Sequence, residues 1–388
     1  MHALLKRMPF VIVVIAMSAL SHGYTAQGAQ DDGQVNTASL FAVVVGISDY
    51  EHGVSPHSLE RASLRDLAHA HEDAIAFRGM LLDCGVPADN IHLLTNEAAT
   101  EARLQDELAW LVDAADEASG LVFYYSGHGS GQVPDVDGDE NARRPGDRFD
   151  EALVPFDALD LYQYDRLEVL SNPGRMAELR AECLDKMLTD DELFGYLSQV
   201  DVPFYVIFDS CFSGGAFRDV DPDAEAEAEA DEDAVEFQCK SPDTKDYQVR
   251  TMPEYFYPDD FRALREADKK AGVILAQQEV MLELPDNIVL LAACTEDQTS
   301  LELNVGGLFT HYLLAALTIS EAQAEADMID KYGNSDGWVD LREAFLLASQ
   351  VVKDESRRIA EQEHDQGLFH QPVALNEAAA ARLKLAER

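Results

Sequence analysis

Four short apolar runs limit what this chain can fold into. Each run is continuous, is rich in branched and aromatic side chains, and gives way to small or polar residues at its end. The runs are Leu40–Gly46, Leu121–Tyr125, Phe204–Phe208 and Asn287–Ala292. Such runs are typical of strands that are buried on both faces, which occur in parallel sheets covered by helices.

Helical patterns separate the first two runs, and this alternation indicates the fold class. Residues 73–82 and 101–115 have helical spacing, and a short strand is expected between them at 91–94. Residues 189–197 begin with Thr and acids, a favourable helix start, and lead into the run at 204. We therefore predict an α/β fold with a mainly parallel central sheet and helices on both faces.

The first residues predict export. Lys6 and Arg7 precede an apolar run of eleven residues, Phe10–Leu20, and small residues follow it at cleavage spacing. Because eleven residues fall well short of the ~20 that span a bilayer as a helix, we interpret residues 1–28 as a signal peptide; an uncleaved anchor is the alternative. We expect a periplasmic or secreted protein without stable membrane insertion.

The net charge limits the expected binding partners, and the cysteine count limits the expected disulfides. The 388 residues include 29 basic and 73 acidic side chains, a formal net charge of −44. This excess repels phosphate backbones, so we expect no nucleic-acid partner. The five cysteines are odd in number and lack framework spacing, so at least one is unpaired in the monomer that we expect. The low Lys share, nine of 29 basic residues, also resembles a salt-adapted surface.

The mature chain divides into segments around an acidic insertion. A polar leader, 29–39, precedes a larger α/β segment, 40–218. The insertion, 219–270, begins with a run at 219–236 that carries ten acids and no base. Like charges and the lack of an apolar face favour a flexible linker there, although Glu and Ala also suit a helix. The smaller segment, 271–388, is expected to complete the same sheet.

Two of the apolar runs end in reactive side chains. In an open α/β sheet, ligands bind beyond the carboxyl ends of the strands. Ser126, His128 and Gly129 follow one run, and Asp209 and Cys211 follow another. An imidazole there can take the proton of a facing thiol, and the amides of Gly129 and Cys211 can bind a developing oxyanion. On spacing alone, a structural His and a structural Cys are the alternative.

These two motifs carry a resemblance to a known family. Tyr-Ser-Gly-His-Gly at 125–129 and Asp-Ser-Cys-Phe-Ser-Gly at 209–214 resemble the catalytic signatures of the metacaspases, the caspase-like cysteine peptidases of bacteria, plants, fungi and protists. The likeness runs from about Phe41 to Leu375 and includes the stretch 293–302, which resembles part of a small subunit. It implies a caspase-like fold.

The resemblance also implies an activity and a specificity. Cys211 would be the nucleophile and His128 the general base and acid of a dyad that hydrolyses peptide bonds. The positions that match the pocket for the residue before the scissile bond are Asp73, Ser126 and Asp209. Two carboxylates pair well with a guanidinium or ammonium group, so the expected partners are proteins or peptides cleaved after Arg or Lys.

Two of the pocket positions have competing interpretations. The motif around Asp73 departs from the family pattern, with His69, Ala70 and Glu72 where Gly, Cys and Asn are usual. The alternative for Asp209 is a strand-end carboxylate that binds the backbone.

Many metacaspases bind Ca²⁺ and some bacterial relatives are calcium-independent, so the resemblance makes Ca²⁺ a candidate cofactor. Four aspartates match the family's calcium ligands: Asp150, Asp190, Asp191 and Asp219. Ca²⁺ takes six to eight oxygen ligands, so such a cluster suits it. Asp219 lies one residue further from the Cys than the family spacing, and Asp190 and Asp191 would equally cap the helix that they begin.

Basic residues after the acidic run indicate possible self-processing, because an enzyme that cuts after Arg or Lys can cut its own exposed loop. An uncut loop is the alternative. The candidates are Lys240, Lys245, Arg250, Arg262, Arg265, Lys269 and Lys270.

The function expected from the sequence is that of a cysteine endopeptidase. The rival from a different class is a non-catalytic caspase-fold scaffold or a calcium-dependent interaction module, against which the intact pair of Cys211 and His128 argues. A closer rival is a legumain-like or gingipain-like peptidase with a different specificity.

Overall fold

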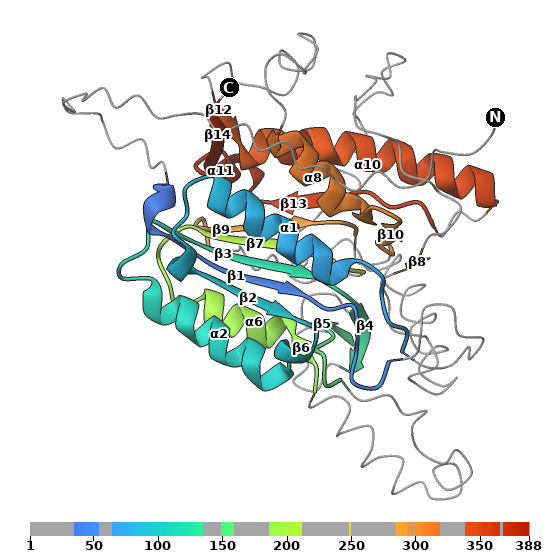
Figure 1. Ribbon diagram of the computed structural model, residues 1–388, viewed down its shortest axis with the longest axis horizontal. Helices are drawn as coiled ribbons and strands as arrows, with labels where there is room; N and C mark the ends of the chain where they lie inside the picture. The colour runs from blue at the N-terminus through green and yellow to red at the C-terminus, as the bar shows by residue number, and fades with distance from the viewer. Residues whose placement is uncertain are drawn as a thin grey trace, which may run out of the picture. The chain divides into compact units, whose positions relative to one another are not determined.

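A six-stranded sheet forms the centre of the described chain (Figure 1). In this computed structural model the described residues are 35–53, 64–134, 149–158, 186–211, 248–249, 285–295, 298–318, 338–364 and 368–387. The strand order is β13-β9-β7-β3-β1-β2. The bounds are β1 Leu40–Gly46, β2 Ile91–Thr95, β3 Gly120–Ser126, β7 Phe204–Asp209, β9 Ile288–Ala292 and β13 Val373–Leu375. Every neighbouring pair is parallel except β13 with β9, so the predicted, mainly parallel sheet is confirmed.

Helices cover both faces of this sheet (Figure 1). One face packs against α1 (Ala70–Asp83), α8 (Leu308–Thr318) and α10 (Leu341–Glu363). The other packs against α2 (Glu101–Ala114) and α6 (Asp190–Leu197). Alternate strand residues divide between two apolar clusters, as the period of a strand requires. The strands are therefore buried on both faces, which explains their continuous apolar sequence.

The helix starts follow capping chemistry. Thr189 is the N-cap of α6, and its hydroxyl oxygen and the Glu192 carboxylate form a capping box. Thr100 caps α2 by accepting a hydrogen bond from the Arg103 amide. Helix α1 begins at Ala70, three residues before the predicted start at Asp73, and its N-cap residue is His69.

Short elements surround the central sheet. One small sheet consists of β4 (Gly129–Pro134), β5 (Phe149–Leu153) and β6 (Leu188–Thr189). A second has the order β11-β10-β8, with β11 Gly306–Gly307, β10 Leu301–Leu303 and β8 Gln248–Val249. A third pairs β12 (Trp338–Asp340) with β14 (Lys384–Glu387). The remaining elements are α11 (Glu377–Ala380) and the 3₁₀ turns Thr37–Ser39, Ala88–Asn90 and Asn96–Ala98.

The two ends of the sequence contribute to one sheet. Strands β9 and β13, from the segment 271–388, extend the sheet that β7 and the earlier strands begin. The interpreted signal peptide at 1–28 and the acidic run at 219–236 lie outside the described residues. Within the insertion 219–270, β8 pairs with β10. Among the described helices, none is long and apolar enough to cross a membrane.

Candidate active site

The predicted nucleophile and base follow neighbouring strand ends. The last register pair of β3 and β7 joins Ser126 to Asp209. His128 and Cys211 each lie two residues beyond that pair, so the strand geometry brings both to the carboxyl edge of the sheet. Both are buried, with 1% and 2% of their surfaces exposed. The register thus supports the facing arrangement that the sequence predicts.

Gly129 shows how closely the two loops approach. A Cβ atom at this position would lie 2.1 Å from the carbonyl oxygen of Cys211, a backbone atom that cannot turn aside. Any side chain there would therefore push the His128 and Cys211 loops apart. The predicted oxyanion positions, Gly129 and Cys211, are adjacent, although their use as donors to a substrate stays a prediction.

His128 is held by its backbone and its ring. Its amide donates to the Tyr50 hydroxyl oxygen at 2.8 Å, and its carbonyl accepts from the Tyr125 hydroxyl at 2.8 Å. Its ring Nε2 lies 2.6 Å from the Arg65 carbonyl oxygen. Because a carbonyl only accepts, Nε2 carries the hydrogen of that bond, and the basic nitrogen of the neutral imidazole is Nδ1.

Cys211 accepts a hydrogen bond from Ser300, a residue far from it in the sequence. The Ser300 amide donates to the Cys211 sulfur at 3.1 Å, and the Ser300 hydroxyl donates to Asp209 Oδ1 at 2.7 Å. The sulfur also lies 3.8 Å from the Ser300 carbonyl oxygen, to which a thiol hydrogen can be donated. Sequence reasoning did not assign a role to Ser300; the only signal was its place in the stretch 293–302.

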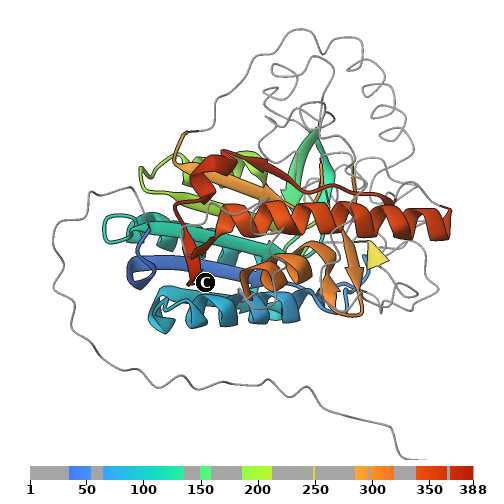
Figure 2. The same ribbon diagram turned by 90° about the horizontal axis from the view of Figure 1, so that it is seen from above.

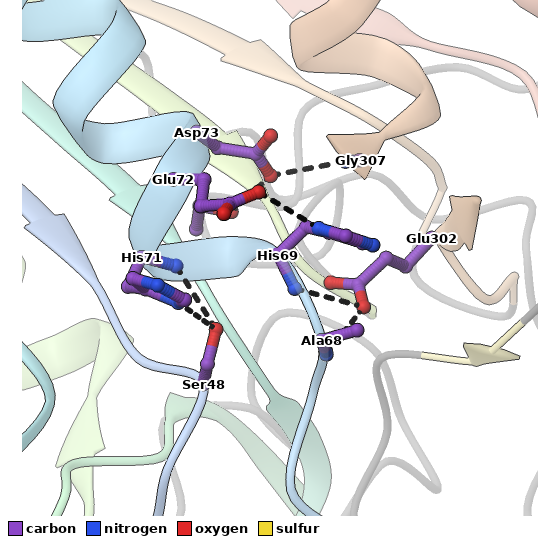
Figure 3. Close-up of polar contacts among 9 residues, drawn as sticks. Ser48, Ala68, His69, His71, Glu72, Asp73, Glu302 and Gly307 are labelled. Carbon is purple, nitrogen blue, oxygen red and sulfur yellow. Dashed lines mark hydrogen bonds and ion pairs between the residues drawn. The ribbon is translucent and has the colours of Figure 1, made fainter. Parts of the chain in front are cut away.

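The three predicted pocket residues meet at the same edge. Asp73 Oδ2 accepts from the Ser126 hydroxyl at 2.9 Å. The same oxygen accepts from the Gly307 amide at 3.0 Å (Figure 3). Asp209 Oδ2 accepts from the Thr310 amide at 2.9 Å. Both carboxylates are buried, with 4% of Asp73 and 0% of Asp209 exposed. Asp209 thus accepts a hydrogen bond from the backbone, as a structural strand-end carboxylate would. It also lies beside the other predicted pocket residues.

The start of α1 is tied to β10. Glu302 is buried, and its Oε1 accepts from the amides of Ala68 at 2.6 Å and His69 at 3.2 Å (Figure 3). The His69 ring lies 2.8 Å from a Glu72 oxygen, whereas the His71 ring lies 2.7 Å from the Ser48 hydroxyl. These contacts fix the turn that carries Asp73 into the site.

A pocket adjoins Cys211 on the α6 side. It is bordered by Ser210, Cys211 and Phe208 of the β7 end, by residues 151–153 of β5, and by Leu188, Thr189, Asp190 and Leu193. Cys211 and Asp190 therefore border one cavity, although Asp190 is not among the predicted pocket positions.

The four calcium candidates are only partly described. Asp190 and Asp191 lie in the first turn of α6, directly after its N-cap Thr189, so a helix-terminal role fits them. Asp150 belongs to β5, which pairs with β6, but its side chain is outside the described residues, and so is all of Asp219. Among the described side chains, no group of three or more His, Cys, Asp or Glu could hold a metal ion.

Comparisons with known proteins show the family of this chain. A family model described as a caspase domain matches residues 39–367. The chain belongs to the caspase domain family. Within it, this caspase domain is similar to metacaspase-1A of Aspergillus oryzae, with 33% identity over 141 residues, 34% of this chain and 26% of that protein. It is also 38% identical to metacaspase-3 of Arabidopsis thaliana over 92 residues, 22% of this chain and 24% of that protein.

These matches extend over part of each relative. The chain spans about a quarter of the length of the curated metacaspases that it matches. Among solved structures, caspase-1 of Spodoptera frugiperda aligns with 91% of this chain and 94% of its own, at 9% identity and a TM-score of 0.42.

Proposed function

We propose that this caspase domain is a cysteine endopeptidase with a Cys211/His128 dyad. The observation that carries the proposal is the β3–β7 register, which brings the imidazole and the thiol to one sheet edge, two residues beyond a shared pair. His128 accepts the thiol proton at Nδ1, and the Cys211 thiolate attacks the peptide carbonyl carbon. The amides of Gly129 and Cys211 then bind the oxyanion.

The proposed specificity is cleavage after Arg or Lys. Asp73 and Asp209 are buried beside Ser126 at the edge where Cys211 lies. The donors named above are amides and hydroxyls, which stabilise a carboxylate without neutralising it. A substrate guanidinium or ammonium group is the partner that such a pair attracts.

Calcium activation, self-processing and export are further parts of this proposal. Asp150, Asp190, Asp191 and Asp219 would supply carboxylate oxygens to Ca²⁺, and a bound ion would stabilise the α6 side of the site. Loss of turnover on chelation, with recovery on Ca²⁺ but not Mg²⁺, supports calcium activation. Unchanged turnover in chelator contradicts it.

The N-terminal residues support export, which fractionation of producing cells tests.

Fluorogenic peptides that end in Arg, Lys or Asp test the activity and the specificity together. We expect turnover of the Arg and Lys peptides by the wild type and none by Cys211→Ala. Cys84→Ala is the matched control, because burial raises the pKa of the Cys84 thiol to about 12 and keeps it protonated. Turnover confined to the Asp peptide contradicts the specificity.

A thiol-directed active-site probe decides between an enzyme and a scaffold. The proposed peptidase reacts at Cys211 in preference to Cys84, although Cys211 is the more buried of the two. Labelling of Cys84 alone, without peptide turnover, favours the non-catalytic rival.

A further inference from the structure

The short segment 300–307 contacts both carboxylates of the proposed pocket. Before β10, the Ser300 hydroxyl donates to Asp209 Oδ1 at 2.7 Å. In β11, the Gly307 amide donates to Asp73 Oδ2 at 3.0 Å. The two strands pair antiparallel, and β10 lies beside the start of α1 (Figure 2, α1 blue and β10 orange). One hairpin therefore connects the two groups that would recognise a cationic side chain.

Glu302, in the middle of β10, holds the turn that precedes α1. It is 1% exposed, and its Oε1 accepts from the amides of Ala68 and His69 (Figure 3). His69 is the N-cap residue of α1, but its side chain makes no capping hydrogen bond. The acceptor for these two amides comes instead from β10, so the helix start is tied to the hairpin.

The register of the hairpin couples this turn to Asp73. Glu302 and Gly307 are opposite each other across β10 and β11. Glu302 binds the amides before α1, and Gly307 binds the Asp73 carboxylate, so two paired residues hold two points of the same helix start. The close approach continues at Gly306, where a Cβ atom would lie 2.2 Å from Asp73 Oδ1. The position of Asp73 therefore depends on where the hairpin holds the start of α1.

The relative position of the two carboxylates matters more for Arg than for Lys. A guanidinium is planar and presents its N–H donors as a rigid fork, whereas an ammonium is a compact charge with rotatable donors. Two carboxylates match such a fork only when their separation and orientation are fixed, but they attract an ammonium over a wider range of positions. Asp209 ends β7 and Asp73 lies in α1, so contacts between separate elements must fix this separation.

We propose that Glu302 is a positioning residue that sets a preference for Arg over Lys. It acts through Asp73 and by its reach: a side-chain oxygen accepts from the two amides and holds the helix start where Asp73 and Asp209 can bind one guanidinium. This inference rests on the proposed peptidase function and deepens its specificity. The competing role for Glu302 is direct attraction of the substrate by its charge.

Two conservative variants separate reach from charge. Glu302→Gln keeps the side-chain length and an oxygen acceptor but loses the charge, whereas Glu302→Asp keeps the charge but is one methylene shorter. Both kcat and KM are measured for matched Arg and Lys peptides. We expect Glu302→Gln to keep the wild-type ratio of kcat/KM between the two peptides. In Glu302→Asp that ratio should fall about tenfold, mainly through a higher KM for the Arg peptide, because hydrogen bonds to a charged group are lost.

Two further measurements guard against a general loss of structure. Glu302→Ala removes reach and charge together and should match Glu302→Asp, so the test does not depend on the folding of one variant. Glu363→Gln and Glu363→Asp, at the exposed end of α10, are the matched controls and should keep the wild-type ratio. Alkylation of Cys211 should be unchanged in every variant, because Ser300 and its bonds are untouched.

The pattern of turnover separates this inference from the proposed function. If Glu302→Asp and Glu302→Ala keep the ratio, or lose Arg and Lys turnover in equal proportion, Glu302 does not set the preference and the peptidase stands. If Glu302→Gln loses the ratio while Glu302→Asp keeps it, charge is the cause and positioning by reach is wrong. If the wild type turns over neither peptide and Cys211 takes no probe, the peptidase proposal fails and the role of Glu302 fails with it.

Discussion

The β3 and β7 ends and the stretch 300–310 form one site but contribute differently to it. The strand ends supply the groups with chemistry, His128 and Cys211, directly after a shared register pair. The stretch 300–310 supplies hydrogen-bond donors: the Ser300 amide and hydroxyl and the amides of Gly307 and Thr310. One region provides reactivity, and the other holds the reactive and charged groups in place.

Burial explains why the second region is needed. A carboxylate removed from water is costly unless donors replace the lost hydration. Asp73 receives a donor from Gly307, and Asp209 receives donors from Ser300 and Thr310. The first region alone would therefore leave both carboxylates poorly solvated, and the comparison predicts that changes in either region alter Arg recognition.

The largest expected effect comes from the carboxylate that both regions share. Asp209→Asn removes a buried charge opposite a cationic substrate, and such losses cost about 2 to 5 kcal/mol. We expect kcat/KM for an Arg peptide to fall about 30-fold or more, while labelling of Cys211 by a small alkylating agent persists. Asp113→Asn, on the exposed face of α2, is the control and should behave as the wild type. An equal loss of labelling and turnover would show that Asp209 positions the nucleophile instead.

A second prediction concerns His370, which precedes β13 and is fully buried. Burial lowers its pKa to about 4, although the charge of Asp209 acts to raise it. Between pH 6.5 and about 4 the unfolded chain therefore binds a proton that the folded chain does not, and the free energy of unfolding falls as the pH falls. The slope is about 1.4 kcal/mol per pH unit, about 3 kcal/mol in total.

Denaturant titrations between pH 7 and pH 4 measure this slope. His370→Gln should reduce it, whatever its effect on stability at neutral pH, whereas His52→Gln, in a partly buried turn, should not. An unchanged slope in His370→Gln would assign the acid sensitivity to other groups.

The same two regions show what the sequence can predict. The prediction matches the strand Leu40–Gly46 to the residue and each end of β3, β7 and β9 within one residue, because strands buried on both faces leave a continuous apolar signal. His128 and Cys211 could be predicted because strand ends collect ligand-binding groups.

The hydrogen bonds that the stretch 300–310 donates to the site could not be predicted in this way. Ser300 and Asp209 are 91 positions apart in the sequence, and Asp73 and Gly307 are 234 apart. Such contacts depend on how β10 and α8 pack after folding, and amide donors have no side-chain signature. The pairing of β8 with β10 was missed for a similar reason, since two residues within a charged insertion carry no periodicity.

The smallest expected effect separates the two bonds of Ser300. Ser300→Ala removes the hydroxyl that donates to Asp209 but keeps the amide that donates to the Cys211 sulfur. A lost hydrogen bond of this kind costs about 1 kcal/mol, so we expect a roughly fivefold rise in KM for an Arg peptide. The pH dependence of Cys211 alkylation should not change, because the sulfur keeps the hydrogen bond from the Ser300 amide. Ser198→Ala, an exposed residue of the α6 C-cap, is the control. A shift of the alkylation profile in Ser300→Ala would show that the hydroxyl, through Asp209, also tunes the nucleophile, and would join the two regions into one electrostatic unit.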